Sequence, residues 1–391
     1  MRATQVLQKS LGGALCDMHG LRRRVLLKAT EALVAGRRLT LMDVARSWPG
    51  ADRVRAPLKA LDRLLGNRHL HAERERIYGG MARWLVRGPR PVIVIDWSDL
   101  KADGSWFLLR AAVPIGGRTL PVLDRVFPAG QQGTPKAEKH FLERLKSILP
   151  PGTCPILVTD AGFRTPWFRS VSAMGWLWLG RLRHRTHVKP VAVADTPDQW
   201  LPCKALYELA TAAPRDLGLM HVATSQAWTC RLIVHGKAPR HRKDRNRDGQ
   251  PARRKASRQN ARREREPWLL VAAPELDLSA RQLVALYGKR MQIESSFRDL
   301  KSHRYGQGFE DSLTRKGPRI AILLLIHALA AFASWIAGLA CEATGLDARL
   351  APYRSNRRLY SIVRIGREAL VRRWPCGTLA SLLDRLRQPA P

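Results

Sequence analysis

The sequence predicts an α/β protein in three consecutive parts: a helical N-terminal region, a central domain of strands and helices, and a helical C-terminal region. Two short apolar runs of the kind found in buried strands carry this prediction. One lies at 91–95 and the other in the stretch CPILVTD, and each leads directly to an aspartate, Asp96 or Asp160. The third observation is a long amphipathic segment, 279–301, that follows the strands.

The charge of the chain favours a polyanionic partner. Its 391 residues suffice for two or three domains, and 68 Lys and Arg stand against 32 Asp and Glu, a formal net charge of +36. Each phosphate that binds a cation releases counterions, so such a chain gains free energy on nucleic acid. A merely soluble basic protein and a protein of acidic membrane surfaces are the alternatives. The spread of charge along the whole chain favours nucleic acid.

The cysteines indicate a reducing compartment. Six are present without C-x2-C pairing or fixed spacing, so we interpret them as reduced thiols of a cytoplasmic protein and not as a zinc site or a disulfide framework. The apolar stretch 11–15 is too short and too glycine-interrupted for a signal peptide. We therefore expect a cytoplasmic protein.

The run 320–341 is long enough to span a bilayer, since it has 22 residues interrupted only by His327 and Ser334. Its Gly, Ala and Ser content, and its place just after the amphipathic segment, favour a fully buried core helix instead. We expect no membrane partner.

Residues 1–88 predict a helical, basic N-terminal DNA-binding domain. Candidate helices are 1–11, 20–35, 40–47 and 56–65. Two short helices joined by a brief turn and flanked by arginines are typical of a helix-turn-helix reader of the major groove. A small helical bundle with exposed cations would give the same pattern, and both interpretations stay open.

The central domain, 89–345, begins with the strand that closes on Asp96. Segments 106–114 and 118–128 predict two antiparallel partners, 136–149 predicts a helix, and a fourth strand ends at Asp160. This order resembles the ribonuclease H-like fold, in which the first and fourth strands lie side by side and their acids converge.

Each aspartate has a simpler interpretation as a strand-end cap or turn residue. Asp99 and Asp103 compete with Asp96 for a catalytic role. We prefer Asp96 because it directly follows the apolar run.

After Asp160 a helix, TPWFRSVSAMGW, and a strand at 176–183 continue the core, and an insertion, about 187–267, then precedes the strand 268–272. It predicts short strands followed by a loop, 237–265, with thirteen Lys or Arg and three acids. Such a loop cannot form a core of its own. We expect it to grip DNA, with a solvated linker as the alternative.

Segment 279–301 predicts one helix, capped by Ser279 with Gln282 in a capping box. Four of its polar residues fall within an arc of roughly 60°: Tyr287, Arg290, Glu294 and Lys301. A carboxylate that can hold a divalent metal and donors that can grip phosphate suit a phosphate-handling site. The alternative is a solvated face on which Glu294 pairs with Arg298.

The spacing Y-x2-R-x3-E-x6-K resembles the signature of DDE transposases of the insertion-sequence-four group. Five ordered stretches are similar to the Tn-ten type within that group: DRLLGNRHLH at 62–71, VIDWSD at 94–99, DAGF with PW at 160–167, EPWLL at 266–270 and KRMQIESSFRDLKS at 289–302. The matching stretches end near Ser302, so the basic helical C-terminal region, 346–391, is the least defined part.

The resemblance implies a role for seven residues. Asp96, Asp160 and Glu294 would be the catalytic, metal-binding triad. Tyr287, Arg290 and Lys301 would contact DNA phosphates near the cleaved end. Trp268 would stack on a base flipped from that end. Without the resemblance, Trp268 is a core tryptophan at a strand start.

The resemblance also implies a mechanism and partners. Two Mg²⁺ ions per site, with Mn²⁺ as a substitute, would support nicking, hairpin formation, hairpin opening and strand transfer. The partners would be the terminal repeats of a bacterial insertion sequence, the target DNA and a second copy in a homodimer. The alternatives are a ribonuclease H-like structure-specific nuclease without strand transfer, and a DNA-binding relic without activity.

Overall fold

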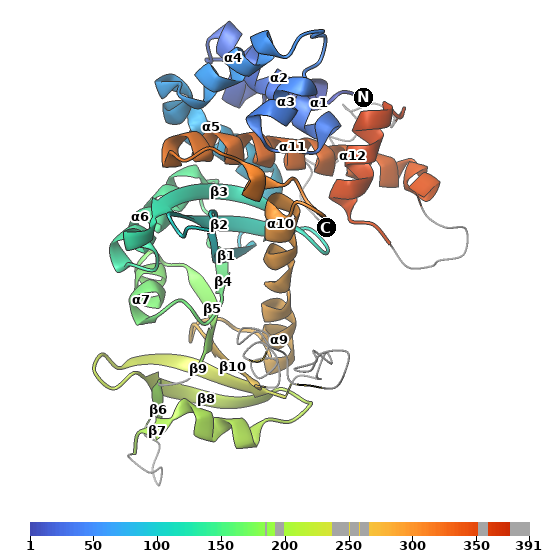
Figure 1. Ribbon diagram of the computed structural model, residues 1–391. Helices are drawn as coiled ribbons and strands as arrows, with labels where there is room; N and C mark the ends of the chain where they lie inside the picture. Colours follow the sequence, from blue (N-terminus) through green and yellow to red (C-terminus); the bar gives the residue numbers. More distant parts are fainter. Residues whose placement is uncertain are drawn as a thin grey trace. The chain divides into compact units, whose positions relative to one another are not determined.

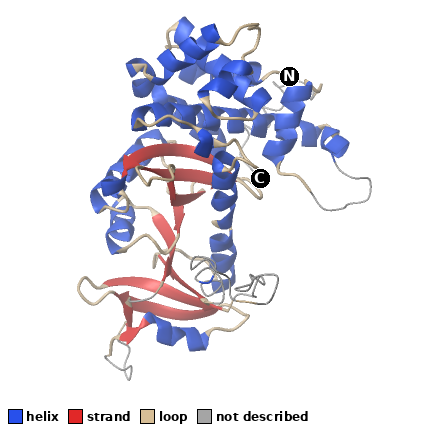
Figure 2. Cartoon of the chain, in the orientation of Figure 1, coloured by secondary structure: helices blue, strands red, loops and turns tan. Residues whose placement is uncertain are grey.

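The computed structural model describes residues 1–183, 186–191, 199–236, 250, 258, 266–350 and 359–375. It is a mixed α/β protein (Figure 2). The chain divides into two compact units, the first formed by Met1–Pro155 and Met291–Pro391 and the second by Ile156–Arg290. The domain boundaries expected at 88 and 345 remain predictions.

The N-terminal helices of the first unit occur close to the predicted positions. They are α1 (Ala3–Leu15), α2 (Gly20–Gly36), α3 (Leu41–Arg46), α4 (Arg55–Leu65) and α5 (Arg68–Leu85). Side-chain caps fix the starts of two of them, because Thr40 accepts the backbone N–H of Asp43 and Asn67 accepts that of Leu70.

Three antiparallel strands follow, in the spatial order β3-β2-β1. They are β1 (Val92–Asp99), β2 (Trp106–Pro114) and β3 (Thr119–Pro128). The expectation that the first strand closes on Asp96 was wrong by three residues. Pairing with β2 continues to Asp99, which lies opposite Phe107, so Asp96 sits inside the strand.

Helix α6 (Pro135–Ile148) follows a short 3-10 turn, η1 (Ala129–Gln131), and covers one face of these strands. Trp97 of β1 lies on that face, donates through Nε1 to Glu138 of α6 at 3.4 Å, and packs against Phe127 of β3. Helix α10, described below, contacts all three strands, and α11 contacts β3.

The second unit is rich in strands, ordered β4-β5-β10-β9-β8-β6-β7. Their bounds are β4 (Ile156–Thr159), β5 (Leu177–Leu182), β6 (His187–Pro190), β7 (Leu201–Pro202), β8 (Arg215–Val222), β9 (Trp228–His235) and β10 (Trp268–Ala272). Strands β4 and β5 are parallel, and β10 pairs antiparallel with β5 and β9.

The helical elements of the second unit are α7 (Thr165–Ala173), the 3-10 segment η2 (Cys203–Leu209) and α9 (Ala280–Gly288). The short strands expected in the insertion are present as β6 to β9. The predicted DNA-gripping loop, 237–265, lies outside the described residues except for 250 and 258.

The expectation of one continuous helix over 279–301 was wrong. The segment forms α9 and α10 (Met291–Lys301), separated by a turn at Lys289 and Arg290. The backbone N–H groups of these two residues bond three residues back, to Leu286 and Tyr287, which tightens the chain after Gly288 and ends α9. The capping box of Ser279 and Gln282 at the start of α9 is confirmed.

Helix α11 (Gly317–Ala343) lies between the N-terminal helices and β3 (Figure 1). It is long and apolar enough to cross a membrane, yet 94% of its most apolar window is buried inside the protein. That burial is what the core-helix interpretation requires. Between α10 and α11 runs the 3-10 turn η3 (Phe309–Asp311), and after α11 come η4 (Leu346–Leu350) and α12 (Ile362–Arg372).

Helices α11 and α12 approach each other closely at two glycines. A Cβ on Gly366 would collide with the Ser334 carbonyl oxygen and the backbone nitrogen of Gly338, and a Cβ on Gly338 would collide with the Ile362 carbonyl oxygen. The two backbones can therefore approach this closely only because neither residue has a side chain.

Gly366→Ala is expected to lower the free energy of unfolding by about 3 kcal/mol, because the added methyl forces two packed backbones apart. Chemical denaturation followed by circular dichroism measures this. The control is Gly13→Ala in α1, where a Cβ would meet nothing within 4 Å and is expected to cost nothing. Equal stability of Gly366→Ala and the unaltered chain would contradict the packing.

Candidate active site

Asp96 lies half-buried on β1, on the sheet face that α10 contacts. Its register partner is Arg110 of β2, whose own partner is Asp124 of β3. Residues directly opposite in antiparallel strands point to the same face, so these three side chains form one row. The Arg110 guanidinium lies 5.3 Å from the ring centre of Phe297 on α10. Phe297 is one turn along α10 from Glu294.

A buried ion pair stands beside Asp96 in that row. Arg110 donates through Nε and Nη2 to the two carboxylate oxygens of Asp124, each at 2.7 Å, and the two residues are 0% and 2% exposed. Bidentate geometry satisfies both carboxylate oxygens, which such deep burial requires. We did not predict this pair from the sequence. The sequence does contain a sign of it: each of two apolar strands carries a charged residue, and these two residues lie opposite each other when the strands pair.

Glu294 is exposed on α10, on the side opposite the one that anchors the helix. Ser296 accepts the backbone N–H of Thr119 at 2.8 Å, and Asp299 pairs with Arg118. At 100° per residue, Ser296 and Asp299 share one side of α10, and Glu294 lies on the other. Ser296 and Asp299 therefore hold α10 from the side opposite Glu294.

Lys301 shares the Glu294 side of α10 to within roughly 20°. Its Nζ donates to the carbonyl oxygen of Asp99 at 3.2 Å and to Asp99 Oδ1 at 3.0 Å. The last turn of α10 is thereby tied to the end of β1. In this structure Lys301 and Asp99 are partners of each other.

Asp160 directly follows β4 in the second unit and is half-buried. Its Oδ1 accepts the backbone N–H of Gly162 at 2.8 Å, which closes a tight turn. The turn is followed by Phe163, whose ring packs on Trp167 at 4.6 Å and is buried. The turn role considered from the sequence is thus present, and it fixes the direction of the carboxylate.

Trp268, Tyr287 and Arg290 gather in the second unit. The rings of Trp268 and Tyr287 meet edge to face at 4.9 Å, and the Arg290 guanidinium lies 5.9 Å from the Tyr287 ring centre. Tyr287 is 2% exposed, and burial raises the pKa of its phenol. The phenol is therefore a neutral donor at physiological pH.

The single helix expected to carry Tyr287, Arg290, Glu294 and Lys301 is divided by the turn at 289–290, with Tyr287 near the end of α9, Arg290 in the turn, and Glu294 and Lys301 on α10. Tyr287 and Arg290 belong to the second unit, and Glu294 and Lys301 to the first. Across the part of the chain that the structure describes, no three side chains of His, Cys, Asp or Glu are grouped closely enough to hold a metal ion.

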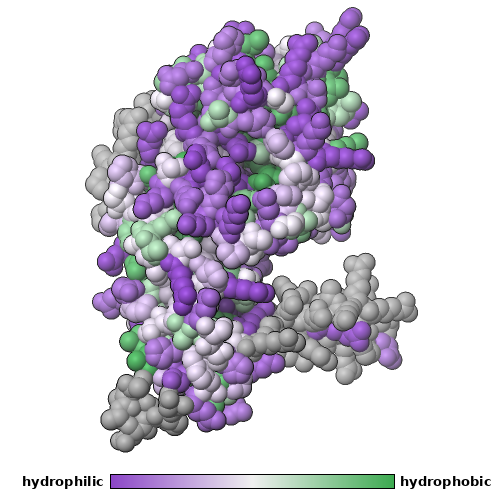
Figure 3. All heavy atoms as spheres, turned by 90° about the vertical axis from the view of Figure 1, so that its left-hand side faces the viewer, coloured by the Kyte–Doolittle hydropathy of each residue, from purple (hydrophilic) through white to green (hydrophobic). Residues whose placement is uncertain are grey.

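The surface fits a nucleic-acid partner. Hydrophilic side chains cover much of the face shown in Figure 3, in keeping with the net charge of +36. A basic α/β chain with aspartates on two strands and a glutamate on a following helix has the features of an enzyme that acts on nucleic acid.

The family follows from comparison with known proteins. Residues 87–333 match the family model of the transposase DDE domain, which is more than half of the chain. The chain therefore belongs to the DDE transposase family. No curated protein matches it. Membership makes the chain a DNA-binding enzyme of the metal-dependent transposase and nuclease class.

Asp124→Ala is expected to lower the free energy of unfolding by about 3 to 5 kcal/mol, since it leaves the Arg110 cation buried and unpaired. The double variant Arg110→Met with Asp124→Leu removes both charges and is expected to cost less than Asp124→Ala alone. Urea unfolding of the three proteins gives the comparison. A cost below about 1 kcal/mol for Asp124→Ala would show that the pair does not hold β2 to β3.

Proposed function

We propose that the chain is a cut-and-paste transposase of the insertion-sequence-four group, of the Tn-ten type. It binds the terminal inverted repeats of a bacterial insertion sequence, cleaves through a DNA hairpin and joins the 3′ ends to target DNA. The observation that carries the proposal is the family match over 87–333, because this range contains all seven residues to which the sequence resemblance assigns a role.

The proposal includes a ribonuclease H-like core. Three antiparallel strands, then α6, then β4 follow the order of that fold. The backbone N–H of Cys154 also donates to the Pro89 carbonyl at 2.8 Å. Within the first unit, the residues just before β4 thus lie beside those just before β1, which supports the proposed core.

Asp96, Asp160 and Glu294 are the proposed metal ligands. Three carboxylates are hard oxygen donors, which suit Mg²⁺ and Mn²⁺. Bound there, two such ions supply an activated water or 3′-hydroxyl and charge neutralisation at the leaving oxygen. The chain's own part is to hold the carboxylates in place: β1 carries Asp96, the Gly162 turn directs Asp160, and α10 presents the exposed Glu294 on the side opposite Ser296 and Asp299.

The contacts of the competing acids support Asp96 over Asp99 and Asp103. Asp99 is the partner of Lys301. Asp103 accepts the backbone N–H of Ser105 at 2.9 Å, and hydrogen bonding to the side chain and the backbone of Ser105 lowers the pKa of its carboxyl. Asp96 lies on the face that α10 contacts, in one row with Arg110 and Asp124.

The proposed DNA contacts are Tyr287, Arg290 and Lys301 to phosphates and Trp268 to a flipped base. A guanidinium beside a neutral phenol is a fitting pair of donors for phosphate oxygens. Trp268 opens β10 and is partly exposed, so an indole face can replace the stacking that a hairpin loses. We place the enzyme, as a homodimer on two element ends, in the bacterial cytoplasm at the nucleoid.

The second candidate is a metal-dependent, structure-specific nuclease of the same fold that does not join ends. The family match favours it over a relic without activity, because the match includes all three carboxylates. The distinguishing step is attack of a 3′-hydroxyl on DNA.

Glu294→Gln is expected to lower the rate of nicking at least about 10³-fold while DNA binding is kept, because loss of one metal ligand removes several kcal/mol of transition-state stabilisation. The assay uses purified protein, Mg²⁺ and a labelled duplex that carries the element's end, resolved on a denaturing gel. Asp96→Asn and Asp160→Asn are expected to behave likewise. The control is Glu275→Gln, an exposed acid before α9 that is expected to leave the rate unchanged.

The products separate the candidate functions. Nick, hairpin and joined products from the unaltered chain support the transposase. Nicks alone favour the nuclease, and equal inactivity of all proteins despite tight binding points to the relic.

A further inference from the structure

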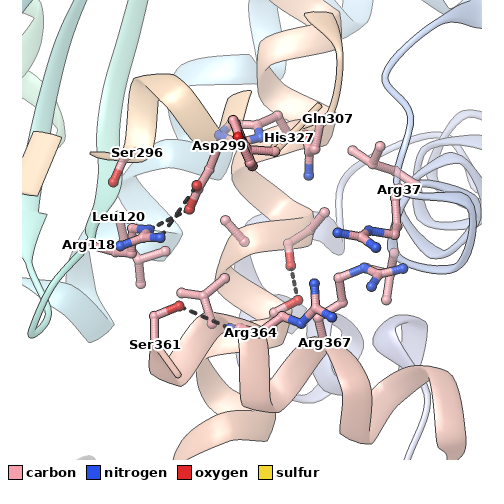
Figure 4. Close-up of a pocket in the computed structure, with 18 of the residues that line it drawn as sticks. Arg37, Arg118, Leu120, Ser296, Asp299, Gln307, His327, Ser361, Arg364 and Arg367 are labelled. Carbon is pink, nitrogen blue, oxygen red and sulfur yellow. Dashed lines mark hydrogen bonds and ion pairs between the residues drawn. The ribbon is translucent and has the colours of Figure 1, made fainter. Parts of the chain in front are cut away.

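A pocket of about 420 Å³ lies within the first unit, apart from the residues proposed for catalysis (Figure 4). It is lined by the end of α2, the start of β3, one side of α10, the middle of α11 and the start of α12. This volume falls in the range of small-molecule sites.

Four arginines line the pocket, and they differ in whether an acidic side chain neutralises their charge. Arg118 is paired with Asp299. The guanidinium groups of Arg37, Arg364 and Arg367 lie together on the other side of the pocket (Figure 4). Arg364 and Arg367 both contact the single carboxylate of Glu368, at 3.1 and 3.4 Å. Of the three grouped cations, only one is therefore matched by an acid.

Arg37 is the uncompensated member. Within the part of the chain that the structure describes, its guanidinium has no hydrogen-bond or ion-pair partner. Burial and the positive charge of Arg37 lower the pKa of Arg367 to about 10. The Nε of Arg367 is buried without a hydrogen-bond partner. An anion in the pocket would satisfy both groups.

The backbone of Arg37 is in an unusual conformation for an arginine. It caps the C-terminus of α2 with φ +67°, the left-handed region, and its N–H bonds to the Leu33 carbonyl at 2.9 Å. Glycine is the ordinary residue at such a position, because any side chain there is strained. The chain thus keeps a cation here at a cost to folding.

The remaining lining is apolar or aromatic. Leu33, Val34 and Leu120 supply aliphatic surface, and Tyr305 and Tyr360 are 62% and 44% exposed. Exposed aromatic rings beside a cationic group are the usual means of holding a nucleobase, since any base can stack on them. Phosphate-binding and base-binding chemistry are therefore present in one pocket.

We propose that this pocket binds a nucleotide, with its phosphate at the grouped guanidinium groups of Arg37, Arg364 and Arg367 and its base against the aliphatic and tyrosine surface. The nucleotide is either free or part of a single DNA strand. The proposal does not depend on the carboxylates assigned to catalysis, and it is tested without metal.

The probe is 2-aminopurine deoxyribonucleoside 5′-monophosphate, whose fluorescence falls on stacking, titrated into the full chain in EDTA. Saturable quenching that inorganic phosphate competes away is expected. Arg37→Gly and Arg364→Gln are each expected to weaken binding roughly tenfold, as loss of a charge-assisted hydrogen bond does. Arg37→Gly also removes the backbone strain, so circular dichroism is expected to show a folded protein.

The matched control is Arg372→Gln. Arg364 lies four residues before Glu368, and Arg372 lies four residues after it and also pairs with it. Arg372 does not line the pocket. Its affinity is expected to equal that of the unaltered chain. A second titration uses a single-stranded oligonucleotide with one internal 2-aminopurine. If only the oligonucleotide is quenched, and if Arg37→Gly and Arg364→Gln weaken its binding while Arg372→Gln does not, the pocket binds a nucleotide within a strand.

Two results would overturn the proposal. One is absence of saturable quenching of either probe by the unaltered chain. The other is an equal loss of affinity in Arg364→Gln and Arg372→Gln, which would show that the probe binds to positive charge in general and not to the pocket.

Discussion

Helix α11 carries apolar residues on every side, so it can lie in water only if other elements cover it all round. The N-terminal helices cover one side, β3 another and α12 a third. Gly338 and Gly366 allow α12 to come close enough to complete the cover. Since β3 is held in this way, its partner β2 and the row of Asp124, Arg110 and Asp96 are held with it. His327, a buried side chain of this helix, is kept neutral, because burial and the nearby Arg110 charge lower its pKa well below the ordinary value.

The ion pairs around the site differ in how firmly they are held. Arg110 and Asp124 are fully buried, and breaking that pair costs several kcal/mol. Lys301 and Asp99 form a partly exposed pair, which contributes about 1 kcal/mol or less. A DNA phosphate can replace Asp99 as the partner of Lys301 at little cost. The chain thus combines a rigid pair that fixes the strands with an exchangeable pair where the proposal places DNA.

Local sequence patterns predicted the elements that depend on local physics. The strands 106–114 and 268–272 were predicted with the observed bounds, and the capping box of Ser279 is present as expected. The long apolar run was interpreted as a buried helix, which the burial of α11 matches.

Features that depend on distant residues could not be read from local patterns. The turn at 289–290 contains no proline, and helical periodicity continues through it in the sequence, so Gly288 was the single local sign of the break and did not suffice to predict it. Strand β1 extends beyond Asp96 because β2 offers partners as far as Phe107. The Arg110–Asp124 pair depends on the exact register of two neighbouring strands, and the arginine pocket joins residues far apart in the chain that only the fold brings together.

The central claim is that Asp96, and not its neighbour Asp99, is a metal ligand. The most direct test replaces each by cysteine and measures DNA nicking in Mg²⁺ and in Mn²⁺, because a thiolate is a poor ligand for Mg²⁺ and a better one for Mn²⁺. The account predicts that Asp96→Cys is inactive in Mg²⁺ and regains measurable nicking in Mn²⁺, while Asp99→Cys nicks in both. Nicking by Asp96→Cys in Mg²⁺ at the rate of the unaltered chain, with the metal dependence found in Asp99→Cys instead, would contradict it.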